Sequence, residues 1–333
     1  MSLRRGFLLA VSFALSGILI VALIKIGRIN LYATFEHLRD VSAVAFAGLV
    51  ALTALHIYLS SLKWRKIDAF LRRSSDSAPS AAASFAITSV GVVCGQVLPV
   101  QISMSAARTV GTYFYGSPLK RGTAGTLYEQ SFDVFIVGFL AIASGVTWFS
   151  KGGAAVYMIA ATIMTIFAVL AVGPSIRFAR SVLSATANSK WARNRVIRRF
   201  ADLEQSGFLN AGLARQLMML SAARFVVQIL MVGQVAEAVG AHISIWQLAA
   251  ATPLAALAYA LAITPGGLGV TELGYAFALH LFGTPVAVAA QWALENRILV
   301  LASCFVVAGI GVAALGLERA LVFKFARDGG KRS

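Results

Sequence analysis

Several ionisable residues of this 333-residue chain lie within long apolar segments, where a charge needs a partner or a function. Glu129 and Asp133 are four residues apart in GTLYEQSFDVF, which places both carboxylates on one face of a helix. Arg224 and Gln228 have the same spacing in a second apolar segment. A charge at the centre of a bilayer costs about 2.5–3.5 kcal/mol on insertion scales. These residues are therefore candidates for a site within the membrane.

Three further charged residues complete the candidate set. Arg108 follows the segment GQVLPVQ, Glu272 follows TPGGLG by three residues, and Arg297 lies within the last apolar segment. Arginines can bind phosphate through their forked donors, and a helix N-terminus after TPGGLG would add backbone N–H groups. We expect a polar cavity for a charged headgroup, lined by Arg108, Glu129, Asp133, Arg224, Glu272 and Arg297.

Two structural alternatives for the same residues remain open. The opposite charges could form interhelical ion pairs that only stabilise the packing of the helices. Glu272 could simply cap the helix that begins after TPGGLG, since it would lie in the first turn of that helix.

The sequence contains no pattern typical of a metal, a cofactor or a catalytic centre. The four histidines are scattered, without metal-ligand spacing to cysteine or carboxylate residues. P-loop, GxSxG and HExxH patterns are absent, and TPGGLG lacks the strand and spacing of a dinucleotide fingerprint. Cys94 and Cys304 lie in apolar stretches, which argues against a disulfide framework. We expect no cofactor, no metal, no catalytic residue and no enzymatic activity.

The elements that must position these residues are membrane-spanning helices. The chain is 59% hydrophobic and 13% charged, and a helix needs about 20 apolar residues to cross the hydrocarbon core. We predict an all-α polytopic bundle in a single transmembrane domain over 1–333, with about six full spans at 7–26, 41–62, 123–149, 153–173, 213–239 and 285–317.

Two further apolar segments are interrupted. The segment 81–107 contains Pro99, and the segment 246–282 is broken at TPGGLG. Proline removes a backbone donor and glycine adds backbone freedom, so we expect two broken or re-entrant helix pairs. Two such breaks of opposite sense are typical of transporters with inverted repeats. Whether 246–282 is a hairpin dip or two short spans stays open. The residues expected to form the breaks are Pro99, Pro265, Gly266, Gly267 and Gly269.

The basic residues indicate the orientation of the chain in the membrane. The formal net charge is +16, but many Lys and Arg residues flank apolar segments, as the positive-inside rule expects of cytoplasmic loops. We expect a basic cytoplasmic loop at 174–210, a basic cytoplasmic tail at 318–333 and an external loop at 27–40. This placement favours a multi-pass protein of the cytoplasmic (inner) membrane with both termini inside, and it argues against nucleic-acid binding.

The motif TPGGLGVTELGYAF resembles the Pro-Gly-Gly-hydrophobic-Gly-x-x-Glu signature of the lysylphosphatidylglycerol synthetase/flippase membrane-domain family. LKWR, GQVLPVQISMSAARTV, LYEQSFDVF and ENRILV resemble further family segments in the same order. The sequence departs from the family pattern in two places. After Pro99 it reads Val-Gln-Ile-Ser, where the family tends to have a glycine and an acidic residue, and it has Gln130 where an arginine is usual. The resemblance points to Pro99, Arg108, Glu129, Asp133, Pro265, Gly266, Gly267, Gly269, Glu272 and Arg297.

The resemblance implies a flippase-like protein that has membrane lipids as its partners. Larger family members carry a soluble aminoacyltransferase, which we expect to be missing from this chain. The implied cargo is an anionic or aminoacylated phospholipid, or a lipid-linked glycan intermediate. Two alternatives are a membrane-embedded transferase acting on a polyprenyl or other lipid, and a non-transporting accessory subunit of envelope biogenesis. A homo-oligomer and a partnership with a lipid-biosynthesis enzyme stay open.

Overall fold

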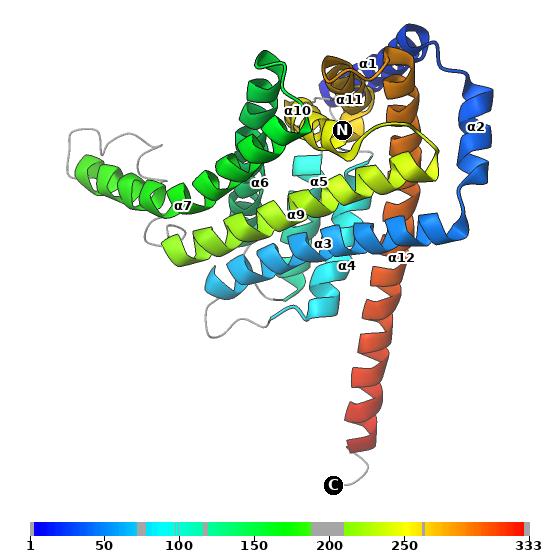
Figure 1. Cartoon of the computed structure of the whole chain (residues 1–333). Coiled ribbons are helices and arrows are strands. Elements are labelled where there is room, and N and C mark those ends of the chain that lie inside the picture. Colours follow the sequence, from blue (N-terminus) through cyan, green and yellow to red (C-terminus); the bar gives the residue numbers. More distant parts are fainter. Residues whose placement is uncertain are drawn as a thin grey trace.

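The computed structural model describes residues 3–71, 78–96, 98, 100–115, 119–187, 210–261 and 264–329 (Figure 1). Over these residues the chain is built of α-helices and contains no strand, which confirms the all-α prediction. The helices are α1 (Leu3–Gly27), α2 (Leu31–Asp40), α3 (Ala43–Leu71), α4 (Ala81–Cys94), α5 (Val100–Phe114), α6 (Leu119–Phe149), α7 (Ala154–Ala187), α9 (Ala211–Ala238), α10 (Ile245–Leu261), the 3-10 helix η2 (Pro265–Gly267), α11 (Val270–Leu281) and α12 (Val286–Gly329).

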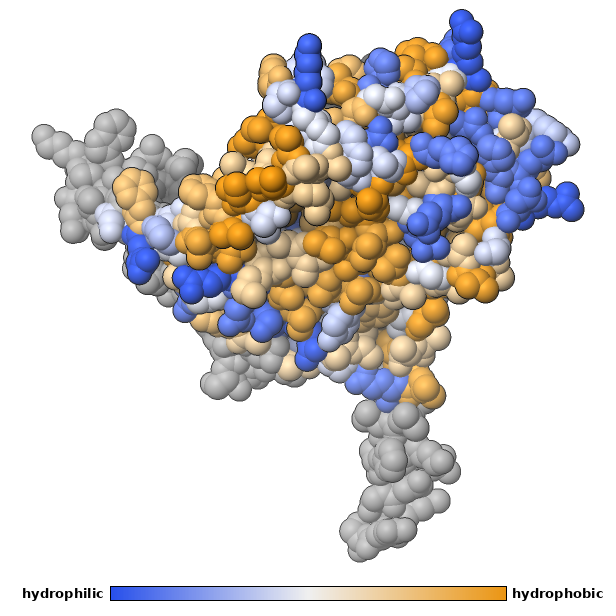
Figure 2. All heavy atoms as spheres, in the orientation of Figure 1, coloured by the Kyte–Doolittle hydropathy of each residue, from blue (hydrophilic) through white to orange (hydrophobic). Residues whose placement is uncertain are grey.

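The long apolar helices are those of a membrane protein. Within the described residues, α3, α6, α7, α9 and α12 are each long and apolar enough to cross a bilayer. α1 and α2 form a sixth candidate span that bends by 91° between them. Figure 2 shows apolar residues over much of the visible face, with hydrophilic residues gathered mainly towards its edges. Such a large exposed apolar surface is suited to lipid rather than to water.

The structure differs from the predicted boundaries in three places. The predicted loop at 27–40 contains the helix α2, because the side chain of Asn30 accepts hydrogen bonds from Tyr32 N and Ala33 N and caps it. α7 continues to residue 187, into the predicted loop at 174–210, although Pro174 lies within it. α12 continues to residue 329, so most of the predicted tail at 318–333 is helical. Charged residues do not end a helix, because their own helix propensity is high.

Both predicted breaks are present, and they meet inside the molecule. α4 ends before α5 begins at residue 100, while Pro99 itself lies outside the described residues. η2 separates α10 from α11, and Gly266 there has a left-handed backbone with φ of 57°. A Cβ atom added to Gly266 would lie 2.5 Å from the carbonyl oxygen of Gln96, which follows α4. The second break therefore packs directly against the first, and only glycine leaves room for this contact.

The chain contains the same helix order twice, which supports the predicted inverted repeat. A long helix, two short helices and another long helix follow one another in α3–α6 and again in α9–α12. α3 packs against α9 and runs antiparallel to it, and α4 packs on α12 as α10 packs on α6 (Figure 1). His56 of α3 and Arg224 of α9 each lie 13 residues after the first residue of their helix, and they contact each other. The two repeats therefore face each other across the seam between α3 and α9.

Candidate functional site

A cavity of about 370 Å³ lies between the two repeats, and most of the predicted site residues line it. Its wall includes Glu129, Asp133, Arg224, Glu272 and Arg297, which come from α6, α9, α11 and α12. The sixth predicted residue, Arg108 of α5, is fully buried behind the wall and bonds to Glu129. The tertiary structure thus brings all six together, although they belong to different helices. The wall also carries amide side chains from Gln96, Gln130, Gln228 and Asn296.

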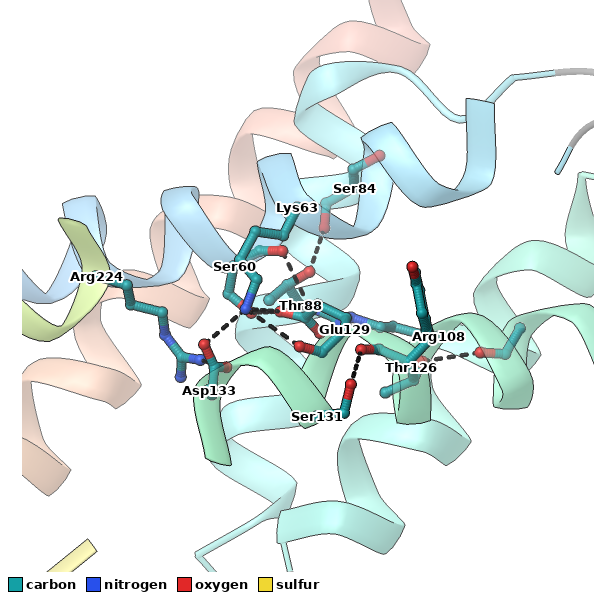
Figure 3. A network of polar contacts seen from close by, with 12 residues as sticks. Ser60, Lys63, Ser84, Thr88, Arg108, Thr126, Glu129, Ser131, Asp133 and Arg224 are labelled. Carbon is teal, nitrogen blue, oxygen red and sulfur yellow. Dashed lines mark hydrogen bonds and ion pairs between the residues drawn. The ribbon is translucent and has the colours of Figure 1, made fainter. Parts of the chain in front are cut away.

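The larger group of charges, here called the Glu129–Asp133 cluster, joins four helices (Figure 3). Lys63 of α3 donates to Asp133 Oδ1 at 2.6 Å, and its Nζ lies 3.5 Å from Glu129 Oε1. Arg108 donates from Nη1 to Glu129 Oε2, and Arg224 donates from Nη1 to Asp133 Oδ2. Three cations therefore surround two carboxylates. Charge pairing of this kind offsets the cost of keeping ionised groups out of water.

Neutral groups add further contacts to the buried Arg108, although its Nε makes no hydrogen bond among the described residues. Ser60 Oγ donates to Glu129 Oε1 at 3.1 Å and accepts from Arg108 Nη2 at 2.9 Å. The guanidinium carbon of Arg108 lies 5.4 Å from the centre of the Trp64 ring, within the range of a cation–π interaction. Lys63 and Arg108 are both 0% exposed, and Glu129 is 1% exposed. This part of the cluster is consequently enclosed between α3, α5 and α6.

His56 extends the cluster towards the seam between the repeats. Arg224 Nε donates a hydrogen bond of 3.0 Å to His56 Nε2. Because an arginine cannot accept a hydrogen bond, His56 must be neutral here, with its proton on Nδ1. His56 Nδ1 is buried without a hydrogen-bond partner among the described residues.

The second group, here called the Glu272–Arg297 pair, lies at the break between α10 and α11. Glu272 Oε2 accepts from Gly269 N at 2.7 Å, which confirms that this carboxylate caps α11. Its other oxygen, Oε1, lies 3.4 Å from Arg297 Nε. Arg297 Nη2 donates to the Gly266 carbonyl oxygen at 3.0 Å. Glu272 thus has both structural roles considered from the sequence. One carboxylate oxygen caps α11, and the other forms an ion pair with Arg297.

The Glu272–Arg297 pair is more loosely bonded than the Glu129–Asp133 cluster. Within the described part of the chain, Glu272 Oε1 and Arg297 Nε have no hydrogen-bond partner, and neither has Asn296 Oδ1 beside them. Glu272 and Asn296 are nonetheless buried. Buried polar atoms of this kind are costly unless something satisfies them, so their arrangement suits a polar ligand.

The breaks predicted from proline and glycine support this pair directly. Pro265, Gly266 and Gly267 are buried in η2, and Gly269 forms the N-cap of α11. The positive φ values of Gly266, Gly267 and Gly269 turn the chain so that the Gly266 carbonyl faces Arg297. The position of Pro99 relative to this site lies outside the described residues.

The most important residue that sequence reasoning missed is Lys63. The sequence places it in the basic LKWRK stop at the cytoplasmic edge, but α3 continues past it and buries it. The available signal is spacing, because His56, Ser60 and Lys63 recur at intervals of four and three residues and so share one helix face. His56 is one of several scattered histidines in the sequence, and its partner Arg224 is remote along the chain.

Glu295, next to the site in sequence, belongs to a separate contact. Its Oε1 lies 2.9 Å from His37 Nδ1 of α2 and accepts from Gln291 Nε2 at 3.1 Å. This contact ties α2 to α12. Among the residues that the structure describes, no group of three or more His, Cys, Asp or Glu side chains could hold a metal ion.

Comparison with known proteins gives one family for the chain. A family model described as the lysylphosphatidylglycerol synthase TM region matches residues 8–313. The matched region includes both breaks, every charged residue of the cavity and both repeats except the end of α12. Neither a curated protein nor a solved structure matches the chain.

Proposed function

Because the chain belongs to the lysylphosphatidylglycerol synthase transmembrane-region family, we propose that it translocates a lipid across the cytoplasmic membrane. The headgroup passes through the cavity between the repeats while the acyl chains remain in the bilayer. The observation that carries the proposal is a cavity between apolar membrane helices whose mainly apolar wall carries five charged side chains. Ionisable groups inside a membrane protein's spanning region are costly and mark the paths of polar substrates.

The two breaks give the proposed path its flexible parts. Non-helical backbone inside a membrane protein is tolerated where it lines a cavity or is buried in protein, and transporters place such breaks around a central site. Here the breaks meet at Gln96 and Gly266, beside Arg297. A small movement of η2 relative to α4 would therefore change the access to the Glu272–Arg297 pair.

The bonding of Glu129 and Asp133 argues against chemistry at the Glu129–Asp133 cluster and favours transport. A membrane transferase would need a carboxylate free to accept or donate a proton. Glu129 and Asp133 are instead bound by Lys63, Arg108 and Arg224. In this proposal the chain is not an enzyme, and the lipid crosses the membrane unchanged. With no nucleotide-binding motif in the sequence, movement runs downhill or on an ion gradient.

We further propose the orientation indicated by the basic residues. Arg4 and Arg5, the basic residues that follow α7 and the end of α12 face the cytoplasm. α3 then returns to the cytoplasm, and the antiparallel α9 runs outwards. This arrangement places the two repeats in opposite senses across the membrane, as inverted-repeat transporters require.

A vesicle assay tests the proposed function. Purified protein is reconstituted with a fluorescent phospholipid, and the fraction of label accessible to an external quencher is followed over time. The double variant Glu272→Ala with Arg297→Ala is expected to reduce the rate by at least about tenfold, because it removes the polar groups at the break. The matched control is Glu36→Ala with Arg39→Ala, which removes the same two charges from the exposed face of α2.

Two results would contradict the proposal. One is a wild-type rate no higher than that of protein-free vesicles for every lipid tested. The other is an equal rate for the wild type and the cavity variant, provided that both variants are folded and inserted.

A further inference from the structure

The charge balance of the cavity restricts the headgroup that it can accept, if lipid translocation is its function as proposed above. Three cations and two carboxylates form the Glu129–Asp133 cluster, and Glu272 and Arg297 balance each other. His56 is neutral, and Glu295 is turned towards α2. The described side chains in and directly behind the wall therefore carry one net positive charge.

This balance disfavours a cationic headgroup. Both carboxylates that could bind an ammonium in the Glu129–Asp133 cluster are already occupied by Lys63, Arg108 and Arg224. The one carboxylate oxygen of the described wall without a hydrogen bond, Glu272 Oε1, lies 3.4 Å from the guanidinium of Arg297. A headgroup with a net positive charge would meet an excess of like charge beside the Glu129–Asp133 cluster, and beside Arg297 it would find only a carboxylate that is already paired.

The neutral polar side chains of the mainly apolar wall suit hydroxyl groups. Four amide side chains line the cavity, from Gln96, Gln130, Gln228 and Asn296, together with the ring of Tyr259. An amide both donates and accepts, as a hydroxyl does, so a polyol can satisfy several amides without adding charge. Among the described residues Asn296 Oδ1, Glu272 Oε1 and Arg297 Nε make no hydrogen bond, although the last two lie 3.4 Å apart as an ion pair.

We infer that the headgroup is rich in hydroxyl groups and carries at most one negative charge. A glycerol or a sugar, alone or attached to one phosphodiester, has this chemistry. An aminoacylated, cationic headgroup does not. The inference separates this chain from the cargo that its family name suggests. Its physical basis is that the excess cation of the Glu129–Asp133 cluster attracts a single phosphate while the amides and the Glu272–Arg297 pair bind hydroxyls.

Headgroup competition in reconstituted vesicles tests the inference. Four lipids with the same labelled acyl chain are compared: phosphatidylglycerol, a monoglucosyl diacylglycerol, phosphatidylethanolamine and lysyl-phosphatidylglycerol. Phosphatidylglycerol or the glucosyl lipid is expected to cross at least about tenfold faster than lysyl-phosphatidylglycerol, because the net positive charge of the cavity repels the cationic lysyl headgroup. The first two lipids distinguish a glycerol phosphodiester from an uncharged sugar as the preferred form.

The possible outcomes separate this inference from the proposed function. If no lipid crosses faster than in protein-free vesicles, the proposed function fails. If lipids cross but lysyl-phosphatidylglycerol or phosphatidylethanolamine is as fast as the hydroxyl-rich lipids, the function stands and the inference is overturned.

A charge-changing variant tests the same point from the side of the protein. Asn296→Asp adds one carboxylate to the wall and cancels the net positive charge. It should lower the preference for phosphatidylglycerol over the lysyl lipid by at least about fivefold. The matched control is Asn30→Asp, the same chemical change at the N-cap of α2, where aspartate caps equally well. An unchanged preference in folded Asn296→Asp protein contradicts the inference, and if that variant does not fold, the wild-type headgroup series decides alone.

Discussion

At the scale of single residues, the Glu129–Asp133 cluster is defined by its excess of positive charge. Lys63 contacts both carboxylates, while Arg108 and Arg224 each contact one. Lys63 and Arg108 are completely buried, so neither can regain water without unfolding. Removing one partner from such a group leaves an uncompensated buried charge, which costs much more than the pair contributes. Removing a carboxylate from the cluster should therefore destabilise the protein to a different extent than removing a cation.

We predict that Asp133→Asn destabilises the protein more than Arg108→Met. The first change leaves three cations with one carboxylate, and we expect it to lower the free energy of unfolding by about 3 kcal/mol. The second leaves two cations with two carboxylates and keeps an apolar stem against Trp64. Unfolding of purified protein in detergent micelles measures both. Asp40→Asn, an exposed aspartate on α2, is the control, and the reverse order of stabilities would contradict the prediction.

At the scale of elements, the two interruptions create the site by turning the chain where a continuous helix would have passed. η2 is short, and its glycines adopt backbone angles that other residues rarely adopt. Gly266 is doubly constrained, because its φ is positive and the carbonyl of Gln96 occupies the place of a side chain. Arg297 then binds the carbonyl of Gly266 and links α12 to the break.

Alanine substitutions separate these two constraints. Gly240 has a φ of 66° and open space where a methyl group would lie, so Gly240→Ala should cost only the backbone strain, about 1 kcal/mol. Gly266→Ala adds a collision with Gln96 O to a similar backbone cost, so it should be more destabilising and should slow lipid movement. Thermal unfolding and the vesicle assay measure the two effects. Equal behaviour of the variants would mean that the breaks do not need their close contact.

At the scale of the whole molecule, the repeats meet along α3 and α9, with His56 and Arg224 paired across the seam. Antiparallel repeats of the same helix order can exchange conformations, which opens a central cavity to one side and then to the other. The seam would then slide or rotate during each cycle.

A cross-link across this seam tests whether it moves. A Cβ atom at Gly48 of α3 would lie 3.7 Å from the side-chain amide carbon of Gln234 of α9, so cysteines at these positions should be within reach of a short thiol cross-linker. We expect the cross-linked Gly48→Cys, Gln234→Cys protein to translocate lipid at least about tenfold more slowly, with recovery on reduction. Each single-cysteine variant, treated identically, is the control. Unchanged transport after complete cross-linking would show that the seam is static.

Local sequence features were enough to predict the helical class, the candidate spans and both interruptions. Hydropathy over about 20 residues and the backbone chemistry of proline and glycine act within one segment, so no tertiary contact is needed to recognise them. The same locality explains the misplaced boundaries. The Asn30 cap, the burial of Lys63 and Trp64 and the helical continuation of α12 are not visible in hydropathy alone.

The residues that carry charge could be chosen from the sequence, because an ionisable group within an apolar segment is costly wherever its partner lies. Their partners could not. Asp133 meets Lys63 from 70 residues away and Arg224 from 91 residues away, across contacts set by the rotation and crossing of separate helices. Only the tertiary structure decided that Glu129 and Asp133 are occupied, that Glu272 Oε1 has no hydrogen bond within the described chain, and that both groups face one cavity. Those pairings determine the net charge of the cavity, and therefore the headgroup that we propose it accepts.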